Sequence, residues 1–293
     1  MTHSLKDYFN VIIVLLIGVV IAFASGQNGL NYNGWPIILI CMTISFLIHW
    51  LAFIPAYMAR TEKFYDISGT VAYLCVLFSA SYLTKFVSSG VLNTRSILTI
   101  TLVSIWALRL GFFLFMRVLK AGEDRRFREV KQKFSGFLVW WTVSALWVFL
   151  TTVNALVMII NNVEYHDDLF MYVGLAIWFI GFFFEVIADE QKRRFRMDPV
   201  HKDQFISIGL WSVSRHPNYF GEILLWIGMA VIAYPTLQGW QHISLISPIF
   251  IYFLLTKISG VNLLEQHADN KWGGKEDYEE YKRNTPILIP FKK

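Results

Sequence analysis

The densest polar segment of the sequence is the run Ser214-Arg-His-Pro-Asn-Tyr-Phe-Gly-Glu222. Pro217 suits the first turn of a helix, where the N–H that proline lacks would have no intrahelical partner. A helix N-terminus attracts anions because its backbone N–H groups are unpaired. Arg215 and His216, which directly precede that point, therefore predict an anion-binding site.

Three more residues of this run, Asn218, Tyr219 and Glu222, continue into the expected helix. Asn218 and Glu222 stand four residues apart and therefore share one helix face. Glu222 is expected near the membrane boundary, where an ionisable side chain indicates a function. The residues leave one alternative open, an interfacial anchor that ends in a helix cap.

A row of two acids and two bases lies at the polar end of an apolar stretch that precedes this run. Glu185 and Asp189 share one helix face, and Arg193 continues it. Arg196 follows at the next turn. Carboxylates accept hydrogen bonds from ribose hydroxyls and the adenine amine, and arginine pairs with phosphate. The row predicts a ligand with hydroxyls and phosphates, although for the arginines a helix-surface salt bridge is an equal alternative.

Two arginines, Arg109 and Arg117, lie within another apolar stretch. Their spacing of eight places them near one helix face. An arginine inside a membrane must pair or face water, so both are candidate site residues. For Arg117 the alternative is a side chain that extends back to the membrane surface.

Two acids stand apart from these sets. Asp66 opens an apolar stretch, so it is either a helix N-cap or a functional acid. Glu265 begins a tail whose aromatic residues are typical of a membrane interface.

Long apolar helices must position these residues. Of 293 residues, 55% are hydrophobic and only 16% are charged, whereas a soluble domain has about a quarter charged residues. Eight apolar stretches approach the ~20 residues that cross a bilayer, at 9–25, 36–58, 66–89, 96–119, 136–160, 169–188, 219–236 and 243–264. We therefore expect an all-α, polytopic integral membrane protein of about eight (seven to eight) transmembrane helices.

The basic residues indicate the orientation of these helices. Lys and Arg gather in the connections 59–65, 120–135 and 189–218 and in the C-terminal tail. The connections 26–35, 161–168 and 237–242 contain neither. The positive-inside rule then places both termini in the cytoplasm. The net charge of +5 follows from this topology, so we expect no nucleic-acid partner.

Several classes of site are missing from the sequence. It has no glycine-rich dinucleotide fingerprint, phosphate loop or Gly-x-Ser-x-Gly elbow. The histidines lack metal-ligand spacing, and the two cysteines lie in apolar runs, so no metal is expected. No repeat or linker divides the chain, which predicts a single membrane domain over residues 1–293.

Together these residues resemble the steroid 5-alpha-reductase family, and in particular its bacterial membrane members of largely unassigned substrate. The resemblance covers residues 60–293. It is strongest in Ile105–Phe127, in Gly209–Glu222 and at the ending Ile289-Pro-Phe291.

The resemblance implies an oxidoreductase of lipid metabolism that acts on a CH–CH group with NADPH. Such an enzyme reduces a carbon–carbon double bond conjugated to a ketone in an apolar, steroid- or isoprenoid-like substrate taken from the bilayer. The helices would enclose a cofactor pocket that faces the cytoplasm, and membrane lipids would surround the protein. The bacterial resemblance places the chain in an inner membrane.

The resemblance also assigns roles to residues. Asp66 is similar to the acid that polarises the substrate carbonyl, and Trp106 stands where the family has a tyrosine. An indole N–H donates a hydrogen bond but cannot transfer a proton. The expected cofactor residues are Arg109, Arg117, Glu185, Asp189, Arg193, Arg196, Arg215, His216, Asn218, Tyr219, Glu222 and Glu265.

Two other functions compete with this interpretation. Arg-His-Pro near a helix start and an Ile-Pro ending also resemble S-adenosylmethionine-dependent membrane methyltransferases of the isoprenylcysteine or phospholipid type. The additional arginines favour NADPH, which has three phosphates. A sterol or lipid carrier without enzymatic activity would not need the polar residues.

Overall fold

A computed structural model describes residues 3–164, 169–258 and 260–291. The prediction of an all-α polytopic membrane protein is confirmed, because eight helices within these ranges are long and apolar enough to cross a membrane. The two described strands are two-residue pieces of one hairpin, β1 (Asn31–Tyr32) and β2 (Trp35–Pro36). Asn33 and Gly34 connect them with positive φ, as a tight hairpin turn requires.

The chain divides into two compact units. Unit 1 comprises residues 1–167 and 233–247, and unit 2 comprises residues 168–232 and 248–293. Two expectations depend on how these units are arranged, namely a single membrane domain over residues 1–293 and a cofactor pocket enclosed by its helices. Both stay predictions.

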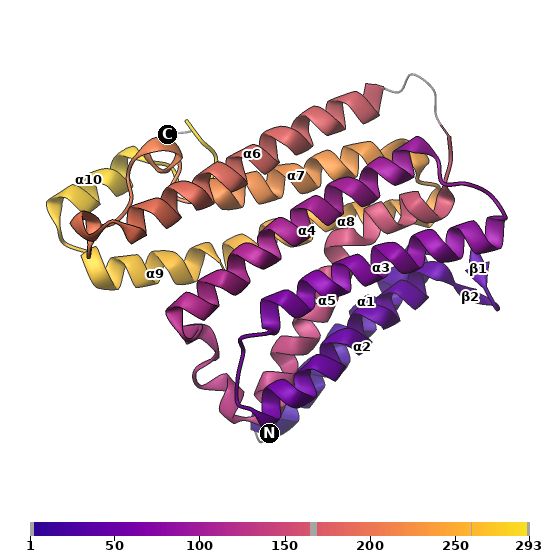
Figure 1. Ribbon diagram of the computed structural model, residues 1–293, viewed down its shortest axis with the longest axis horizontal. Coiled ribbons are helices and arrows are strands. Elements are labelled where there is room, and N and C mark those ends of the chain that lie inside the picture. The colour runs from indigo at the N-terminus through magenta and orange to yellow at the C-terminus, as the bar shows by residue number, and fades with distance from the viewer. Residues whose placement is uncertain (1–2, 165–168, 259, 292–293) are drawn as a thin grey trace. The chain divides into compact units, whose positions relative to one another are not determined.

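Unit 1 is built around α5 (Phe134–Asn161), most of which is buried. Helices α1, α2 and α3 pack against it (Figure 1). The other elements of unit 1 are α1 (His3–Ser25), α2 (Ile37–Met58), α3 (Tyr65–Ser88), α4 (Thr94–Ala121) and the short 3-10 turns η1 (Arg125–Phe127), η2 (Val130–Gln132), η5 (Tyr234–Thr236) and η6 (Gly239–Leu245). A helix that is apolar on all sides is expected to be buried by neighbouring helices, and α5 is buried in this way.

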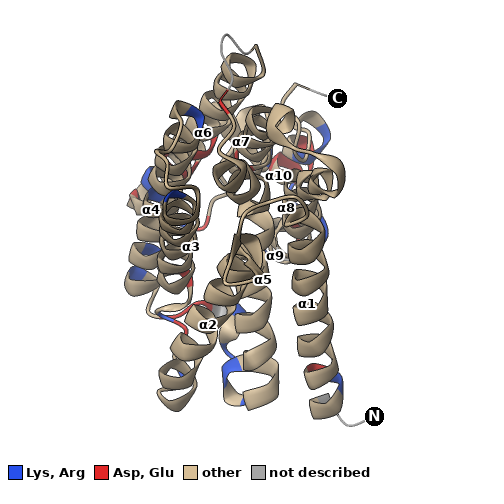
Figure 2. Cartoon of the chain, turned by 90° about the vertical axis from the view of Figure 1, so that its right-hand side faces the viewer, with Lys and Arg blue, Asp and Glu red and all other residues tan. Residues whose placement is uncertain are grey.

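Helix α1 begins before the first predicted apolar stretch. It starts at His3 and contains one acidic residue, Asp7, and one lysine, Lys6. Figure 2 shows charge on α1 only near its N-terminal end. The Asp7 carboxylate accepts a hydrogen bond of 2.7 Å from the Ser135 hydroxyl at the start of α5, so this polar end is tied to the central helix.

Unit 2 contains α6 and α7, side by side in Figure 1. Its described elements are α6 (Leu169–Met197), η3 (Pro199–His201), η4 (Gly209–Ser212), α7 (Pro217–Ala233), most of α8 (Ile246–Phe253), the π-helical turn η7 (Leu254–Ile258), α9 (Val261–Trp272) and α10 (Glu276–Asn284). The predicted single stretch 243–264 is therefore a chain of different helical turns. Helix α6 also continues well beyond residue 188, so its polar row is part of the same helix.

Glycines allow α6 and α7 to approach closely. A Cβ atom added at Gly181 would lie 2.6 Å from the carbonyl oxygen of Gly221, and one added at Gly221 would lie 2.5 Å from the backbone nitrogen of Glu185. Small residues at such crossings bring helix backbones together in membrane proteins. This contact places the polar end of α6 beside the first turns of α7.

The glycine contact gives a direct test of packing. We expect Gly181→Ala to lower the free energy of unfolding by about 1–3 kcal/mol, because the added methyl group would overlap the α7 backbone. The matched control is Gly69→Ala in α3, where an added Cβ meets nothing within 4 Å. There the same change should stabilise the helix by about 0.5–1 kcal/mol. Thermal midpoints in detergent that move in the same direction would contradict this packing.

Candidate functional site

The polar run begins where the sequence predicts it, since α7 starts at Pro217. The backbone N–H of His216 donates to the Ser214 hydroxyl oxygen at 3.2 Å, and that hydroxyl donates to the Leu288 carbonyl at 2.7 Å. The Arg215 N–H donates to the Pro286 carbonyl at 2.9 Å. The C-terminal segment therefore fixes the backbone just before α7.

Glu265 joins this site from α9. Its carboxylate accepts from His216 Nε2 at 2.8 Å and pairs with Arg215 Nη2 at 3.0 Å. The Tyr219 ring stacks on the His216 ring, with centroids 5.7 Å apart. Burial lowers the pKa of His216, and the hydrogen bond to Glu265 offsets only part of that effect. The sequence predicted each of these residues but not that Glu265 would bridge two of them.

The acids of α6 meet the polar face of α7. Glu185 and Asp189 are buried on one face of α6, as their spacing predicts. The Asn218 amide donates to Asp189 Oδ1 at 3.1 Å. Glu222 is also buried, directly after the glycine that contacts the backbone of Glu185. The predicted carboxylates and the amide thus gather at one crossing of two helices.

The arginines of α6 lie at its exposed end. Arg193 donates to both oxygens of Glu190, at 2.6 and 2.7 Å. Arg194 pairs with the same carboxylate. For Arg193 the structure therefore shows the helix-surface salt bridge that the sequence left open. Arg196 is exposed one turn beyond.

The segment Gly209-Leu-Trp211, in the turn η4, docks on this end of α6. Gly209 has a φ of +60°, which glycine adopts without strain. The Leu210 N–H donates to Gln191 Oε1 at 2.9 Å, and Trp211 Nε1 donates to the Ala188 carbonyl at 3.0 Å. Lys192 lies over the Trp211 ring, 4.2 Å from its centroid. The motif therefore supports the helix segment that bears Asp189.

These residues fit a phosphorylated, hydroxyl-rich cofactor. Arg215 Nε and His216 Nδ1 are buried and have no hydrogen-bond partner within the residues that the structure describes. A buried polar group of this kind is costly unless a ligand or water satisfies it. Both lie at the start of α7, where an anion is favoured. The acids of α6 are suitable acceptors for hydroxyl groups.

A second polar cluster lies in unit 1 around Asp66. This residue is in the first turn of α3, but the N-cap position belongs to Phe64 and has no side-chain cap bond. The N-cap alternative for Asp66 is therefore wrong. The side chains whose charges act on it are Arg126, Arg117 and Asp124.

Asp124 organises the arginines of this cluster. Arg126 Nε donates to Asp124 Oδ1 at 3.1 Å and Arg126 Nη2 donates to Asp124 Oδ2 at 2.6 Å, and Arg117 Nη2 lies 4.0 Å from the same Oδ2. Burial would raise the pKa of Asp124, but the bonds from Arg126 outweigh it and hold that pKa below its usual value. Arg117, near the C-terminal end of α4, therefore has an acidic partner in Asp124. The sequence did not single out Arg126 for the site.

Trp106 is fully buried on α4, and its surroundings supply a residue that the sequence analysis missed. The ring of Tyr73, on α3, meets the Trp106 ring edge-on with centroids 5.2 Å apart. The Tyr73 hydroxyl lies 2.7 Å from the Thr151 hydroxyl. Tyr73 is seven residues after Asp66, a helical repeat that would have indicated a shared face. Arg109, further along α4, lies over the Phe113 ring at 5.3 Å.

Glu62 is a second residue that the sequence analysis missed. Its buried carboxylate accepts from the backbone N–H of Asp124 at 2.8 Å and from Lys131 Nζ at 2.7 Å. Arg60, from the same loop, donates to the carbonyls of Lys131 and Gln132. These bonds join the loop before α3 to the loop after α4, so they position both sides of the Asp66 cluster.

Comparison with known proteins places the chain in a family. The model of the family described as "Protein of unknown function (DUF1295)" matches residues 52–285. The chain belongs to this family. Its matched region includes both polar clusters. No solved structure matches the chain.

Curated relatives connect this DUF1295 protein to steroid and sterol enzymes, which confirms the predicted resemblance. It is 29% identical to the 3-oxo-5-alpha-steroid 4-dehydrogenase 1 of Bos taurus over 118 residues, 40% of each chain. The Rattus norvegicus enzyme of the same name matches equally. The Delta(14)-sterol reductase ERG24 of Saccharomyces cerevisiae is 27% identical over 192 residues, 62% of this chain. The chain spans only 40–42% of the length of these relatives.

The buried imidazole of His216 predicts a pH dependence of stability. Because burial lowers its pKa below 6.5, the unfolded chain takes up a proton below that pH that the folded chain does not. The stabilisation is complete above about pH 6.5 and is lost as the pH falls. We expect the thermal midpoint of the wild type to fall more between about pH 7.5 and about pH 5.5 than that of His216→Gln.

The matched control for this experiment is His267→Gln, since His267 is exposed on α9 in the same unit. That variant should keep the wild-type pH profile. Parallel profiles for the wild type and His216→Gln would show that His216 does not cause the acid loss.

Proposed function

We propose that this protein is a membrane reductase that uses NADPH to saturate a carbon–carbon double bond conjugated to a ketone in an apolar, steroid- or isoprenoid-like substrate. The observation that carries the proposal is the buried polar set at the α6–α7 crossing, with Asn218 bonded to Asp189 and Glu265 bridging Arg215 and His216. Relatives named as a steroid dehydrogenase and a sterol reductase support the reaction class.

The residues of unit 2 divide between the parts of the cofactor. Arg215 and the start of α7 would hold phosphate, because they combine positive charge with unpaired N–H groups. Neutral His216, whose Nε2–H is donated to Glu265, would accept a hydrogen bond from a cofactor hydroxyl through Nδ1. Asp189 and Glu185 would accept from ribose hydroxyls, and Arg196 would pair with a further phosphate. When bound, NADPH supplies a hydride to the β-carbon of the enone. The protein orients the two reactants and excludes water.

The residues of unit 1 would act on the substrate ketone. As the β-carbon is reduced, negative charge develops on the ketone oxygen. Hydrogen-bond donors placed there in advance lower the barrier. We assign this role to Trp106, whose buried indole N–H can donate, and to Asp66, whose carboxyl would donate as the protonated acid. A proton on the α-carbon completes the reaction.

The methyltransferase alternative gains nothing from the relatives, whose names describe a dehydrogenase and a reductase. For the location we propose a bacterial inner membrane with both termini in the cytoplasm. The cytoplasmic location of the termini is proposed because Lys and Arg gather in the connections and the tail on that side of the membrane.

Cofactor binding is the first test of this function. In detergent, NADPH at about 100 times its Kd should stabilise the protein by about 2.7 kcal/mol, whereas S-adenosylmethionine should not. Thermal unfolding midpoints with each compound measure this. Stabilisation by S-adenosylmethionine alone would refute the reductase.

Variants of the α6–α7 crossing test the site assignment. Asn218→Ala and Arg196→Ala should each weaken NADPH binding about tenfold, the effect of one lost charged or polar contact. The matched control is Arg194→Ala, because the Arg194 side chain is 76% exposed and pairs with Glu190. Equal affinity in all three folded variants would contradict the assignment.

Asp66→Ala tests the catalytic role in unit 1. We expect the rate of NADPH oxidation with a 3-oxo-4-ene steroid to fall by about 10²–10³, the usual effect of losing one group that stabilises an oxyanion. The stabilisation by NADPH should remain, which separates catalysis from binding. A variant with the wild-type rate would exclude Asp66 from the chemistry.

A further inference from the structure

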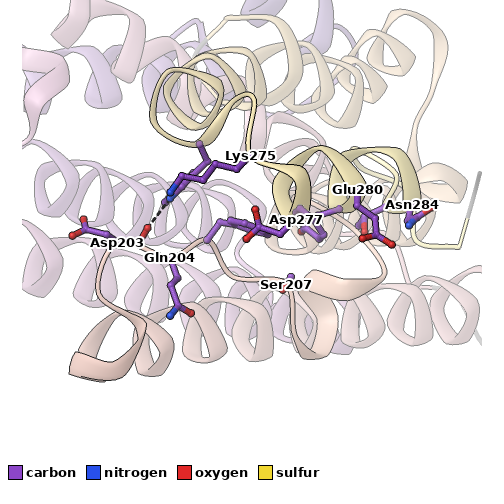
Figure 3. A pocket seen from close by; sticks show the side chains of 11 residues that line it. Asp203, Gln204, Ser207, Lys275, Asp277, Glu280 and Asn284 are labelled. Carbon is purple, nitrogen blue, oxygen red and sulfur yellow. Dashed lines mark hydrogen bonds between the residues drawn. The ribbon is translucent and has the colours of Figure 1, made fainter.

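Unit 2 contains a cavity that the proposed reaction does not use. It has a volume of about 450 Å³ and lies between the loop after η3, the end of α9 and helix α10 (Figure 3). Its wall includes Asp203, Phe205, Trp272, Lys275, Asp277 and Glu280. None of the predicted cofactor residues lines it.

Aromatic rings form one side of this cavity. Phe205 packs against Trp272 and Tyr281, with ring centroids 5.9 and 5.3 Å apart. Trp272 Nε1 donates to the Asp203 carbonyl at 2.7 Å, the bond dashed in Figure 3. The Tyr281 hydroxyl donates to the Trp211 carbonyl at 2.6 Å. Because the polar atoms of these rings already have partners, the rings offer mainly apolar surface to a ligand.

The α10 side of the cavity is negatively charged. Asp277, Glu280 and Asn284 follow one another at helical spacing, and Figure 3 shows them in a row along α10. Asp277 accepts from the Tyr278 backbone N–H at 2.8 Å. Within the described residues, neither Asp277 nor Glu280 forms an ion pair. Two carboxylates therefore face the cavity with their charge uncompensated.

The opposite side has the reverse polarity. Asp203 pairs with Lys271 at 2.9 Å, so these two charges cancel. Lys275 lines the cavity as well and is labelled on the same side as Asp203 in Figure 3. The cavity is thus dipolar, with an ammonium group at one end and two carboxylates at the other.

The cavity lies at the end of a candidate membrane span. That span runs over Gly239–Trp272, and Trp272 itself lines the cavity. Tryptophan and lysine at the end of a span are typical of the headgroup level of a bilayer. A ligand at this depth can come from the membrane surface or from the aqueous phase.

We propose that this cavity binds a phosphorylated amino alcohol. Its ammonium group would lie between Asp277 and Glu280 with its alkyl carbons on the aromatic rings, and its phosphate would pair with Lys275. The shared chemistry fits a zwitterionic lipid headgroup and a free glycerophospho-amine alike. This proposal is independent of the reductase function.

The test uses the full-length protein in detergent and glycerophosphoethanolamine as the probe. We expect it to bind at least about tenfold more tightly than glycerol phosphate or ethanolamine, each of which satisfies one end of the cavity only. Glu280→Gln, Asp277→Asn and Lys275→Gln should each weaken it about five- to tenfold. The matched control is Glu276→Gln, on the same helix but outside the cavity wall, which should bind as the wild type does.

Nanodiscs distinguish the two sources of the ligand. Protein in phosphatidylethanolamine nanodiscs should no longer bind the soluble probe if the headgroup fills the cavity, whereas protein in phosphatidylglycerol nanodiscs should still bind it. Equal probe binding in both nanodiscs would assign the site to the free compound. Equal affinity for the probe and its two fragments, or wild-type affinity in all three cavity variants with unchanged thermal midpoints, would overturn the proposal. Neither result depends on NADPH or on reductase activity.

Discussion

The close crossing of α6 and α7 is the contact on which the candidate cofactor site depends. Gly181 and Gly221 leave no room for a side chain between the two backbones. Helices separated by larger residues would stand 8–10 Å apart, and a short amide such as Asn218 would then not reach Asp189. The glycines therefore bring the two helices close enough for the polar side chains to form their hydrogen bonds. A site built on two packed helices is also more rigid than one on loops.

Two carboxylates of this protein, those of Glu265 and Glu62, are each held by a basic side chain and a second hydrogen bond. Glu265 is shared by Arg215 and His216, and in unit 1 Glu62 is shared by Lys131 and a backbone N–H. Removing one partner of such a pair leaves a charge in a medium of low dielectric, which costs far more than the pair contributes. In unit 1 the Glu62 bonds define where the loops around Asp66 lie, so Asp66 is positioned by neighbours to which no chemical role is assigned.

The two polar clusters suit different parts of one reaction. The α6–α7 crossing combines acids, an amide and buried N–H donors, as a phosphorylated and hydroxylated cofactor requires. The Asp66 cluster combines an acid with arginines, and the two helices beside it carry the buried rings of Tyr73 (α3) and Trp106 (α4), which contact each other. Hydrogen-bond donors in such surroundings act strongly on a developing charge, because water does not compete with them.

The sequence alone determined the long apolar helices and which of them bears each site residue, with the exception of Glu265, which it placed in the tail and the structure places on α9. Apolar length and the start at Pro217 depend on local chemistry, so α6 and α7 could be predicted within a few residues, with the polar end of α6 as the exception. Only the tertiary structure decided that Glu265 bridges Arg215 and His216 and that Tyr73 lies against Trp106. The spacing of residues along one helix fixes a face, but the partner of that face lies far away in the chain. Tertiary packing selects that partner, and a local sequence pattern does not reveal it.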